Sequence, residues 1–128
     1  MKFKVAALAI LSALSLHAQA QTPTEIQWWH SMTAVNGEWV NDLAKEFNAS
    51  QKEYKVVPTY KGTYDESMTA AVAAFRAGNA PDILQVFEVG TATMMASKSA
   101  IVPVGKVMKD AGQPFDPGAY VPAVAGYY

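Results

Sequence analysis

The amino-acid sequence predicts an α/β fold in which a mostly parallel sheet is flanked by helices. Strand-like and helix-like stretches alternate along the chain in the order β-α-β-α-β-α, which is typical of parallel strands joined by right-handed crossovers. The chain contains no cysteine, so an apolar core rather than disulfide bonds must hold the fold together. Its length suits one modest domain.

Residue type and spacing predict the first two strands and the helix between them. Residues 26–31 are rich in aromatic side chains, as strands often are. Within residues 36–47 the apolar positions recur at helical spacing, which places them on one face of a helix. Residues 54–60 form the second expected strand. Pro58 favours an edge position or a bulge for this strand, because proline lacks an amide hydrogen.

The next helix carries signals at both ends. Thr63 and Glu66 match a capping box, in which each residue bonds the backbone of the other, and Gly78 is expected to end the helix. A third strand is expected at residues 82–88, whose apolar centre suits a buried parallel position. Three shorter elements follow: a helix from Gly90 through residues 94–96, a short strand or extended link at 101–104, and a helical turn or two at 107–111 closed by Gly112.

The first twenty residues have the features of a secretory signal peptide. Lys2 and Lys4 precede an apolar stretch of about 12 residues, and small residues stand at Ala18 and Ala20 before the expected cleavage site. A membrane-spanning helix would need roughly 20 apolar residues. Residues 1–20 are therefore interpreted as the signal peptide and residues 21–128 as the exported chain. No cysteine at the cleavage site could carry a lipid, so we expect the exported chain to be soluble. A soluble exported protein needs a second barrier to retain it, which favours a periplasmic location.

Composition and motifs argue against several classes of protein. The exported chain has 8 basic and 11 acidic residues, a formal charge of −3, and no basic run that favours nucleic acid or anionic lipid. Its sequence lacks a hydrolase nucleophile elbow, a phosphate-binding loop and a dinucleotide-binding glycine motif. With His30 as its single histidine, paired-histidine catalysis and histidine-based metal clusters are excluded. We therefore predict a binding protein rather than an enzyme, with no metal or cofactor.

Candidate binding residues lie just past the expected strands. In open α/β sheets, ligands bind beyond the carboxyl ends of the strands. Those ends carry Trp29, His30, Ser31, Tyr60, Tyr64 and Glu88. Aromatic rings suit the CH faces and hydroxyls of a polyol. Tyr64, at the start of a helix, and Glu88, at the end of an apolar strand where an unpaired carboxylate is costly, are the stronger candidates.

Several of these residues also have a purely structural explanation. Trp28 or Trp29 must point into the core, because neighbours on a strand face opposite sides. For Tyr60, packing within the sheet is as good an explanation as contact with a ligand. Met94 and Met95 are interpreted as core residues.

Two stretches carry a resemblance to a known family. One is Tyr-Lys-Gly-Thr-Tyr at residues 60–64, and the other is the run from Gly-Asn-Ala-Pro-Asp through Val-Phe-Glu-Val-Gly to Ser at residues 78–97. Shorter matches occur at residues 29–32, 42–48, 57–60 and 121–128. On these residues the chain resembles the family-1 extracellular solute-binding proteins, in particular those that receive glycerol phosphates for ABC importers.

The resemblance implies a periplasmic-binding-protein-like lobe of a two-lobed receptor that closes around its solute. The implied solute is sn-glycerol-3-phosphate or a glycerophosphodiester, and the implied partners are the membrane permease subunits of an ABC transporter. Tyr64 and Glu88 are implied ligand contacts. Since like charges repel, we expect Glu88 to accept hydrogen bonds from the glycerol hydroxyls rather than to hold the phosphate. Members of the family run to several hundred residues, so residues 21–128 would be the first lobe, with the second lobe missing.

Two other functions stay open on the sequence. One is a sugar or oligosaccharide receptor of the same broad family, which nothing in this stretch excludes. The other is an exported hydrolase, although the stretch lacks the catalytic residues that a hydrolase requires.

Overall fold

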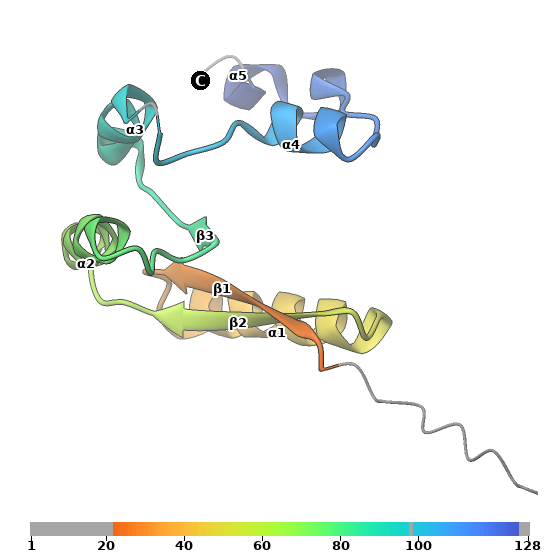
Figure 1. Cartoon of the computed structure of the whole chain (residues 1–128), viewed down its shortest axis with the longest axis horizontal. Coiled ribbons are helices and arrows are strands. Elements are labelled where there is room, and N and C mark those ends of the chain that lie inside the picture. Colours follow the sequence, from red (N-terminus) through yellow and green to blue (C-terminus); the bar gives the residue numbers. More distant parts are fainter. Residues whose placement is uncertain (1–21, 98, 126–128) are drawn as a thin grey trace, which may run out of the picture.

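The computed structural model describes residues 22–97 and 99–125, which form an α/β fold with a three-stranded parallel sheet (Figure 1). This confirms the predicted fold class. The expected signal peptide, residues 1–20, lies outside the described residues. The elements are β1 (Thr24–His30), α1 (Ala34–Ser50), β2 (Tyr54–Tyr60), α2 (Tyr64–Arg76), β3 (Ile83–Leu84), α3 (Glu88–Ala96), α4 (Val104–Asp110), the 3-10 helix η1 (Pro117–Ala119) and α5 (Pro122–Ala125).

β1 is the central strand of the sheet. The strand order is β2-β1-β3, and both neighbours run parallel to β1. β2 pairs with β1 over its whole length, from Tyr54 opposite Thr24 to Tyr60 opposite His30. β2 is therefore an edge strand of this sheet, as Pro58 predicts. From β1 the chain continues to β2 on one side and later crosses to β3 on the other side. The connections therefore diverge at the carboxyl end of β1, and such a point is where open parallel sheets bind ligands.

The third strand is much shorter than residues 82–88, and its predicted length and burial are wrong. In β3, Ile83 and Leu84 pair with Trp28 and Trp29 of β1. Ile83 is 44% exposed, so β3 is a short outer strand in this structure and not a buried central one.

Side chains extend the contact between β1 and the β3 segment. The Gln27 N–H donates to Asp82 Oδ2 at 2.8 Å before β3 begins, and the Ser31 N–H donates to Gln85 Oε1 at 3.0 Å after it ends. The Gln85 N–H donates to the Trp29 carbonyl at 2.9 Å. One backbone donor within β1 and one just past its end are thus bonded by side chains, which lets the chain turn away after Gln85 without leaving these amides unpaired.

Both ends of α2 match the sequence prediction. The Thr63 hydroxyl accepts from the Glu66 N–H at 3.3 Å, and Glu66 Oε2 accepts from the Thr63 N–H at 2.7 Å, which completes the capping box. At the other end, the Gly78 N–H donates to the carbonyl of Phe75 and the Asn79 N–H to that of Ala74. Gly78 adopts a φ of 75°, which a residue with a Cβ rarely tolerates.

The α1 helix is longer than predicted and is tied to β2. Its buried residues are Val40 and Ala44. Near its end, the Asn48 side chain accepts from the Val56 N–H at 2.7 Å and donates to the Val56 carbonyl at 2.8 Å. The amide thus satisfies backbone groups of an edge strand that would otherwise be open to pairing with another chain.

The buried core of the described residues is small. The buried apolar side chains are Val40, Ala44, Ala71 and Ala74, and the buried polar ones are His30 and Ser67. Large apolar residues remain exposed on the helices, among them Trp39, Phe47 and Phe75. Backbone pairing and helix caps therefore contribute a larger share of this fold's stability than they do in a domain with a full core.

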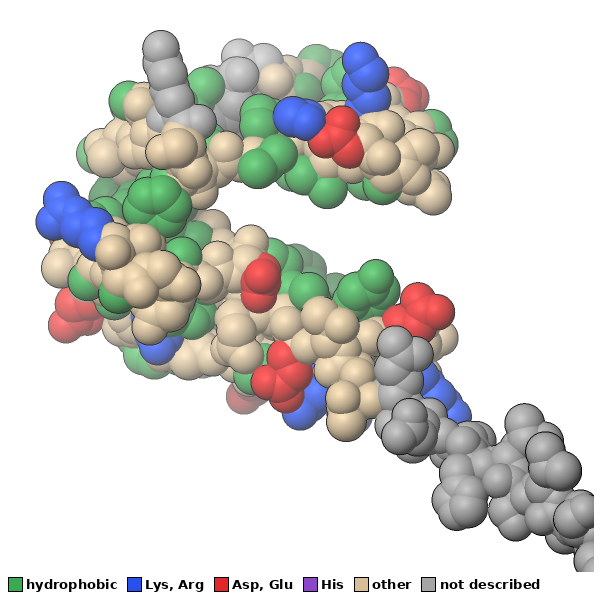
Figure 2. Space-filling view, viewed as in Figure 1, with side chains coloured by type: hydrophobic (Ala, Val, Ile, Leu, Met, Phe, Trp, Pro, Cys, Tyr) green, Lys and Arg blue, Asp and Glu red, His purple; other side chains and the backbone are tan. Residues whose placement is uncertain are grey.

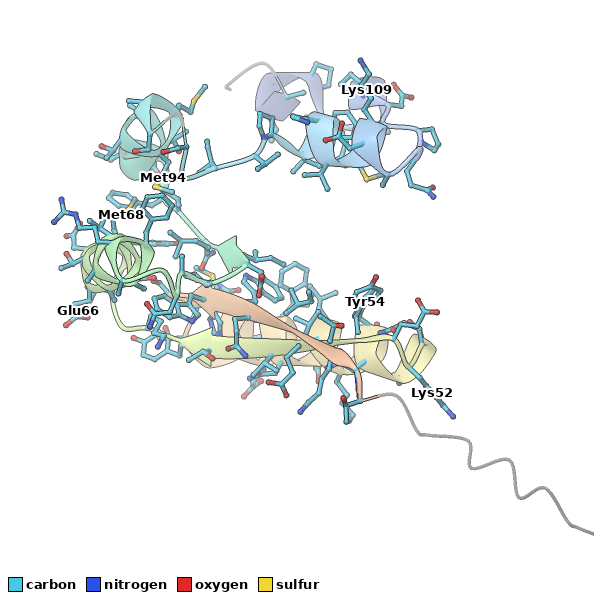
Figure 3. All side chains as sticks on the ribbon, in the orientation of Figure 1. Lys52, Tyr54, Glu66, Met68, Met94 and Lys109 are labelled. Atoms are coloured by element: carbon cyan, nitrogen blue, oxygen red, sulfur yellow. The ribbon has the colours of Figure 1, made fainter. Side chains whose placement is uncertain are left out.

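The α3 helix packs on α2 at Gly90. A Cβ on Gly90 would lie 2.9 Å from Val86 Cγ1 and 3.0 Å from Met68 Cε, so glycine is the residue that permits this approach. Figure 3 places Met94 of α3 facing Met68 of α2. Met94 is half-buried, but Met95 is 56% exposed, so its assignment to the core is wrong.

A large hollow separates the C-terminal helices from the sheet and α2 (Figure 2). Its volume is about 1230 Å³. Apolar side chains dominate its lining, including Phe75, Ile83, Val86, Ile101 and Val107. Within residues 22–97 and 99–125, no helix is both long and apolar enough to cross a membrane.

We expect Thr63→Ala to lower the free energy of unfolding by about 1 kcal/mol, because the Glu66 N–H loses its cap. Urea unfolding monitored by circular dichroism measures the change. Thr69→Ala is the matched control, since Thr69 is exposed within the same helix and alanine favours helix there. Equal stability of the two variants would show that the capping box does not stabilise α2.

Candidate ligand-binding edge

The carboxyl ends of the three strands are bonded into one edge. The Lys61 N–H donates to the His30 carbonyl at 2.9 Å, which continues the β1–β2 ladder past β2. On the other side of β1, Gln85 bonds Trp29 and Ser31. We call residues 29–31, 60–64 and 85–88 the carboxyl edge.

Tyr64 connects the loop after β2 to the loop after β3. It is the first residue of α2 and is half-buried. Its ring stacks on Phe87, with centroids 5.1 Å apart and planes inclined by 28°. Such stacking stabilises a pair of rings by more than the burial of their apolar surface alone. The predicted convergence of these two loops is therefore present at Tyr64 and Phe87.

Glu88 follows Phe87 directly, but it does not end a strand as predicted. It is the first residue of α3, and its side chain is exposed. The burial cost that singled it out in the sequence is therefore absent. A carboxylate in the first turn of a helix is instead stabilised by the helix dipole. Because the Tyr64–Phe87 stack anchors the preceding residue, the start of α3 lies next to the start of α2.

His30 is buried and surrounded by aromatic rings. It is 4% exposed, and its ring lies 6.2 Å from that of Trp28 and 6.1 Å from that of Tyr60. Its Nδ1 accepts from the Met32 N–H at 3.3 Å. Burial lowers the pKa of His30 below its ordinary value. These contacts suit a neutral packing residue better than a ligand contact.

The remaining candidates differ in how far solvent reaches them. Tyr60 is 52% exposed, with one side of its ring toward His30. Trp29 is half-buried, and the Lys61 ammonium lies 4.0 Å from its ring centroid. Ser31 is half-buried too, and its hydroxyl oxygen is buried without a hydrogen-bond partner among the described residues.

Sequence reasoning missed two residues of the edge, Gln85 and Lys61. Gln85 is the one amide in the otherwise apolar stretch of residues 83–87, and such a lone polar residue often bonds backbone. Lys61 follows directly on the β2 strand. The position of Lys61 just past a strand is the signal that could have found it, and for Gln85 the signal is its place as a lone amide among apolar residues.

The edge suits a small polar solute, whereas the hollow does not. Rings, a carboxylate, an ammonium and a hydroxyl meet along the edge, as in sites that fix a hydroxylated ligand by a few polar groups. The hollow presents mainly aliphatic and aromatic surface. Across the described ranges, no three His, Asp or Glu side chains lie close enough to hold a metal ion.

We expect the free energy of unfolding to fall as the pH is lowered from 7 to 5. The pKa of His30 is lowered in the folded chain, so the unfolded chain binds its proton first, and stability is lost as the pH drops through the ordinary histidine value near 6.5. Urea unfolding at several pH values measures this slope. The His30→Gln variant should show a flatter dependence, and an identical slope for both proteins would contradict the prediction.

Comparison with known proteins agrees with the resemblance seen in the sequence. Residues 31–128 match the family model of bacterial extracellular solute-binding proteins. The chain is 55% identical over 128 residues to the sn-glycerol-3-phosphate-binding periplasmic protein UgpB of Escherichia coli O1:K1. It is 51% identical over 116 residues to the protein of the same name from Brucella abortus strain 2308.

The alignment with the E. coli relative covers 100% of this chain but 28% of the relative. The alignment with the Brucella relative covers 91% of this chain but 27% of the relative. It therefore spans less than a third of the length of these relatives. The family match, by contrast, covers most of the chain, including every residue of the carboxyl edge except Trp29 and His30. The chain belongs to the bacterial extracellular solute-binding protein family.

Proposed function

We propose that residues 21–128 form the first lobe of a periplasmic receptor for sn-glycerol-3-phosphate or glycerophosphodiesters. In this proposal residues 1–20 are the signal peptide that exports it, and the receptor delivers its solute to the permease subunits of an ABC importer. The observation that carries the proposal is the Tyr64–Phe87 stack, which brings the starts of α2 and α3 together at the carboxyl edge. The names of the E. coli and Brucella relatives supply the solute class.

Glu88 and Tyr64 would bind the hydroxylated end of the solute. An exposed carboxylate accepts hydrogen bonds from two neighbouring hydroxyls at once, and it repels a phosphate. The Tyr64 ring, held by Phe87, offers a flat apolar surface to the carbon chain and a phenolic hydroxyl as donor. The ligand would thus lie with its glycerol end toward α3.

Binding rather than turnover fits the chemistry of the edge. A general base must reach the proton that it removes, but His30 is buried among rings and bonded to the Met32 N–H. The relatives carry the names of binding proteins. We therefore propose that the chain is not an enzyme.

A single lobe should bind its solute weakly. A pocket normally buries most of a small ligand's surface, and in hinge-closing receptors the second lobe supplies the opposite wall. The carboxyl edge is one open wall. Affinity for this chain alone is therefore expected in the millimolar range, where roughly 4 kcal/mol of binding free energy is gained.

Titration of the isotope-labelled chain followed by NMR tests the proposed solute. We expect sn-glycerol-3-phosphate to shift the amide signals of Tyr64 and Glu88 saturably, because both lie at the edge that faces the ligand. Maltose is the comparison ligand. Saturable shifts with maltose and none with sn-glycerol-3-phosphate would replace the proposal by the sugar-receptor alternative.

We expect Glu88→Ala to raise the dissociation constant for sn-glycerol-3-phosphate at least about fivefold, since ligand hydroxyls lose a charged acceptor. The same NMR titration measures the constant. Glu46→Ala is the control, because Glu46 is an exposed glutamate on α1, away from the carboxyl edge. An unchanged constant in Glu88→Ala would remove Glu88 from the site.

A further inference from the structure

Gln85 attaches the end of the β3 segment to β1 by two hydrogen bonds. Its backbone N–H donates to the Trp29 carbonyl at 2.9 Å, and its side-chain Oε1 accepts from the Ser31 N–H at 3.0 Å. In the β1–β3 register Trp29 pairs with Leu84, so Gln85 continues this register opposite His30. One residue thus bonds the chain on both sides of His30.

The side chain of Gln85 takes the place of a backbone acceptor. In a parallel ladder, a residue that bonds the neighbouring strand donates its N–H to the residue before its partner and accepts from the residue after it. The Gln85 N–H follows this pattern, but the bond from Ser31 goes to the side-chain oxygen and not to the backbone carbonyl. The strand can therefore end here with the Ser31 amide still paired, and the chain leaves the sheet toward α3 (Figure 1).

The bonds of Gln85 lie close in sequence to the proposed ligand contacts. Two residues separate Gln85 from Glu88, the first residue of α3. Because each residue advances the chain by at most about 3.6 Å, the Cα atoms of Gln85 and Glu88 are no more than roughly 11 Å apart. The bonds from Gln85 to β1 and the stack of Phe87 on Tyr64 of α2 are thus two attachments that fix where α3 begins. Neither ion pair of the described residues involves Glu88, so the position of its carboxylate depends on its backbone.

We propose that Gln85 is a positioning residue for solute binding, whose side-chain amide holds the start of α3 so that Glu88 faces the ligand. Gln85 acts through the segment of residues 86–88, without a contact of its own to the solute. A carboxylate that is already held in place loses less conformational entropy on binding, which raises affinity. This inference rests on the proposed function, because it concerns the carboxylate that is assigned there to the glycerol hydroxyls.

Gln85→Met tests the bond, because methionine has a similar length and an unbranched stem but no oxygen to accept from the Ser31 N–H. We expect this N–H to exchange faster with solvent, and the nuclear Overhauser cross-peaks between Tyr64 and Phe87 to weaken. We also expect the dissociation constant for sn-glycerol-3-phosphate to rise about three- to tenfold, as for loss of one partly buried hydrogen bond. Hydrogen exchange and the NMR titration measure these changes.

Asp82→Leu is the matched control, because Asp82 makes the same kind of bond between the same two segments. Its Oδ2 accepts from the Gln27 N–H at 2.8 Å, but it precedes β3 and so lies at the opposite end from the carboxyl edge. We expect this variant to lower the free energy of unfolding and to leave the dissociation constant unchanged. An equal loss of affinity in both variants would show that Gln85 acts only through the stability of the sheet, and would overturn its positioning role.

Two conservative variants separate the bond from the bulk of the side chain. Gln85→Glu keeps an oxygen at the same reach, so slow exchange of the Ser31 N–H and the Tyr64–Phe87 cross-peaks should return. Its added charge repels an anionic solute, so the rescue is read from these two signals and not from affinity. Gln85→Asn keeps the amide but is one methylene shorter, and it should reproduce the loss of affinity if Gln85→Met is too unstable to be measured.

The positioning role and the proposed function can fail separately. If the wild-type chain binds sn-glycerol-3-phosphate and Gln85→Met binds it equally well with the Tyr64–Phe87 cross-peaks intact, the positioning role is overturned and the proposed solute stands. If the wild-type chain does not bind sn-glycerol-3-phosphate, the proposed function fails. Weakened cross-peaks in Gln85→Met would then still show that Gln85 sets the start of α3.

Discussion

Parallel pairing on both sides of β1 is the constraint on which the rest of the structure depends. Because β2 and β3 both run parallel to β1, the loops that leave all three strands emerge at one edge of the sheet. No side chain has to be buried deeply to bring them together. The backbone bonds from Lys61 to His30 and from Gln85 to Trp29 join the three strand ends directly, and the Tyr64–Phe87 stack then sets the helices that follow.

This arrangement explains how a chain with a small core can still present an ordered edge. The buried apolar residues are short side chains apart from Val40, so hydrophobic burial supplies less stability here than in a typical domain. Local interactions stabilise the helices and strands instead. They are the capping box at Thr63, the glycine that ends α2 at Gly78, and the hydrogen bonds of the Asn48 amide to β2. The capping box acts at the carboxyl edge, and the Asn48 amide acts on β2, one of the strands that form this edge.

Features set by neighbouring residues were predictable from the sequence. The capping box, the helix-ending glycines at Gly78 and Gly112, and the edge position signalled by Pro58 each follow from the chemistry of a few adjacent residues. All are present in the structure. The expected convergence of strand ends followed from the alternation of strands and helices, which is a property of the whole pattern.

The errors came from contacts between residues distant in sequence. At both ends of the short third strand, the side chains of Asp82 and Gln85 bond backbone amides in and just past β1, and local propensity does not register such bonds. Glu88 consequently begins a helix and does not end a strand. Met95 is exposed although its segment is apolar, because burial depends on what packs against a helix. Lys61 was overlooked because its partner, Trp29, lies on another strand.

The central claim is that the loops after β2 and β3 converge at the carboxyl edge, and a nuclear Overhauser experiment on the isotope-labelled chain tests it most directly. With rings 5.1 Å apart, Tyr64 and Phe87 should give strong cross-peaks between their aromatic protons. Cross-peaks between β1 and β2 without any between these two rings would mean that the sheet forms but its loops do not meet, and the binding edge would then not exist.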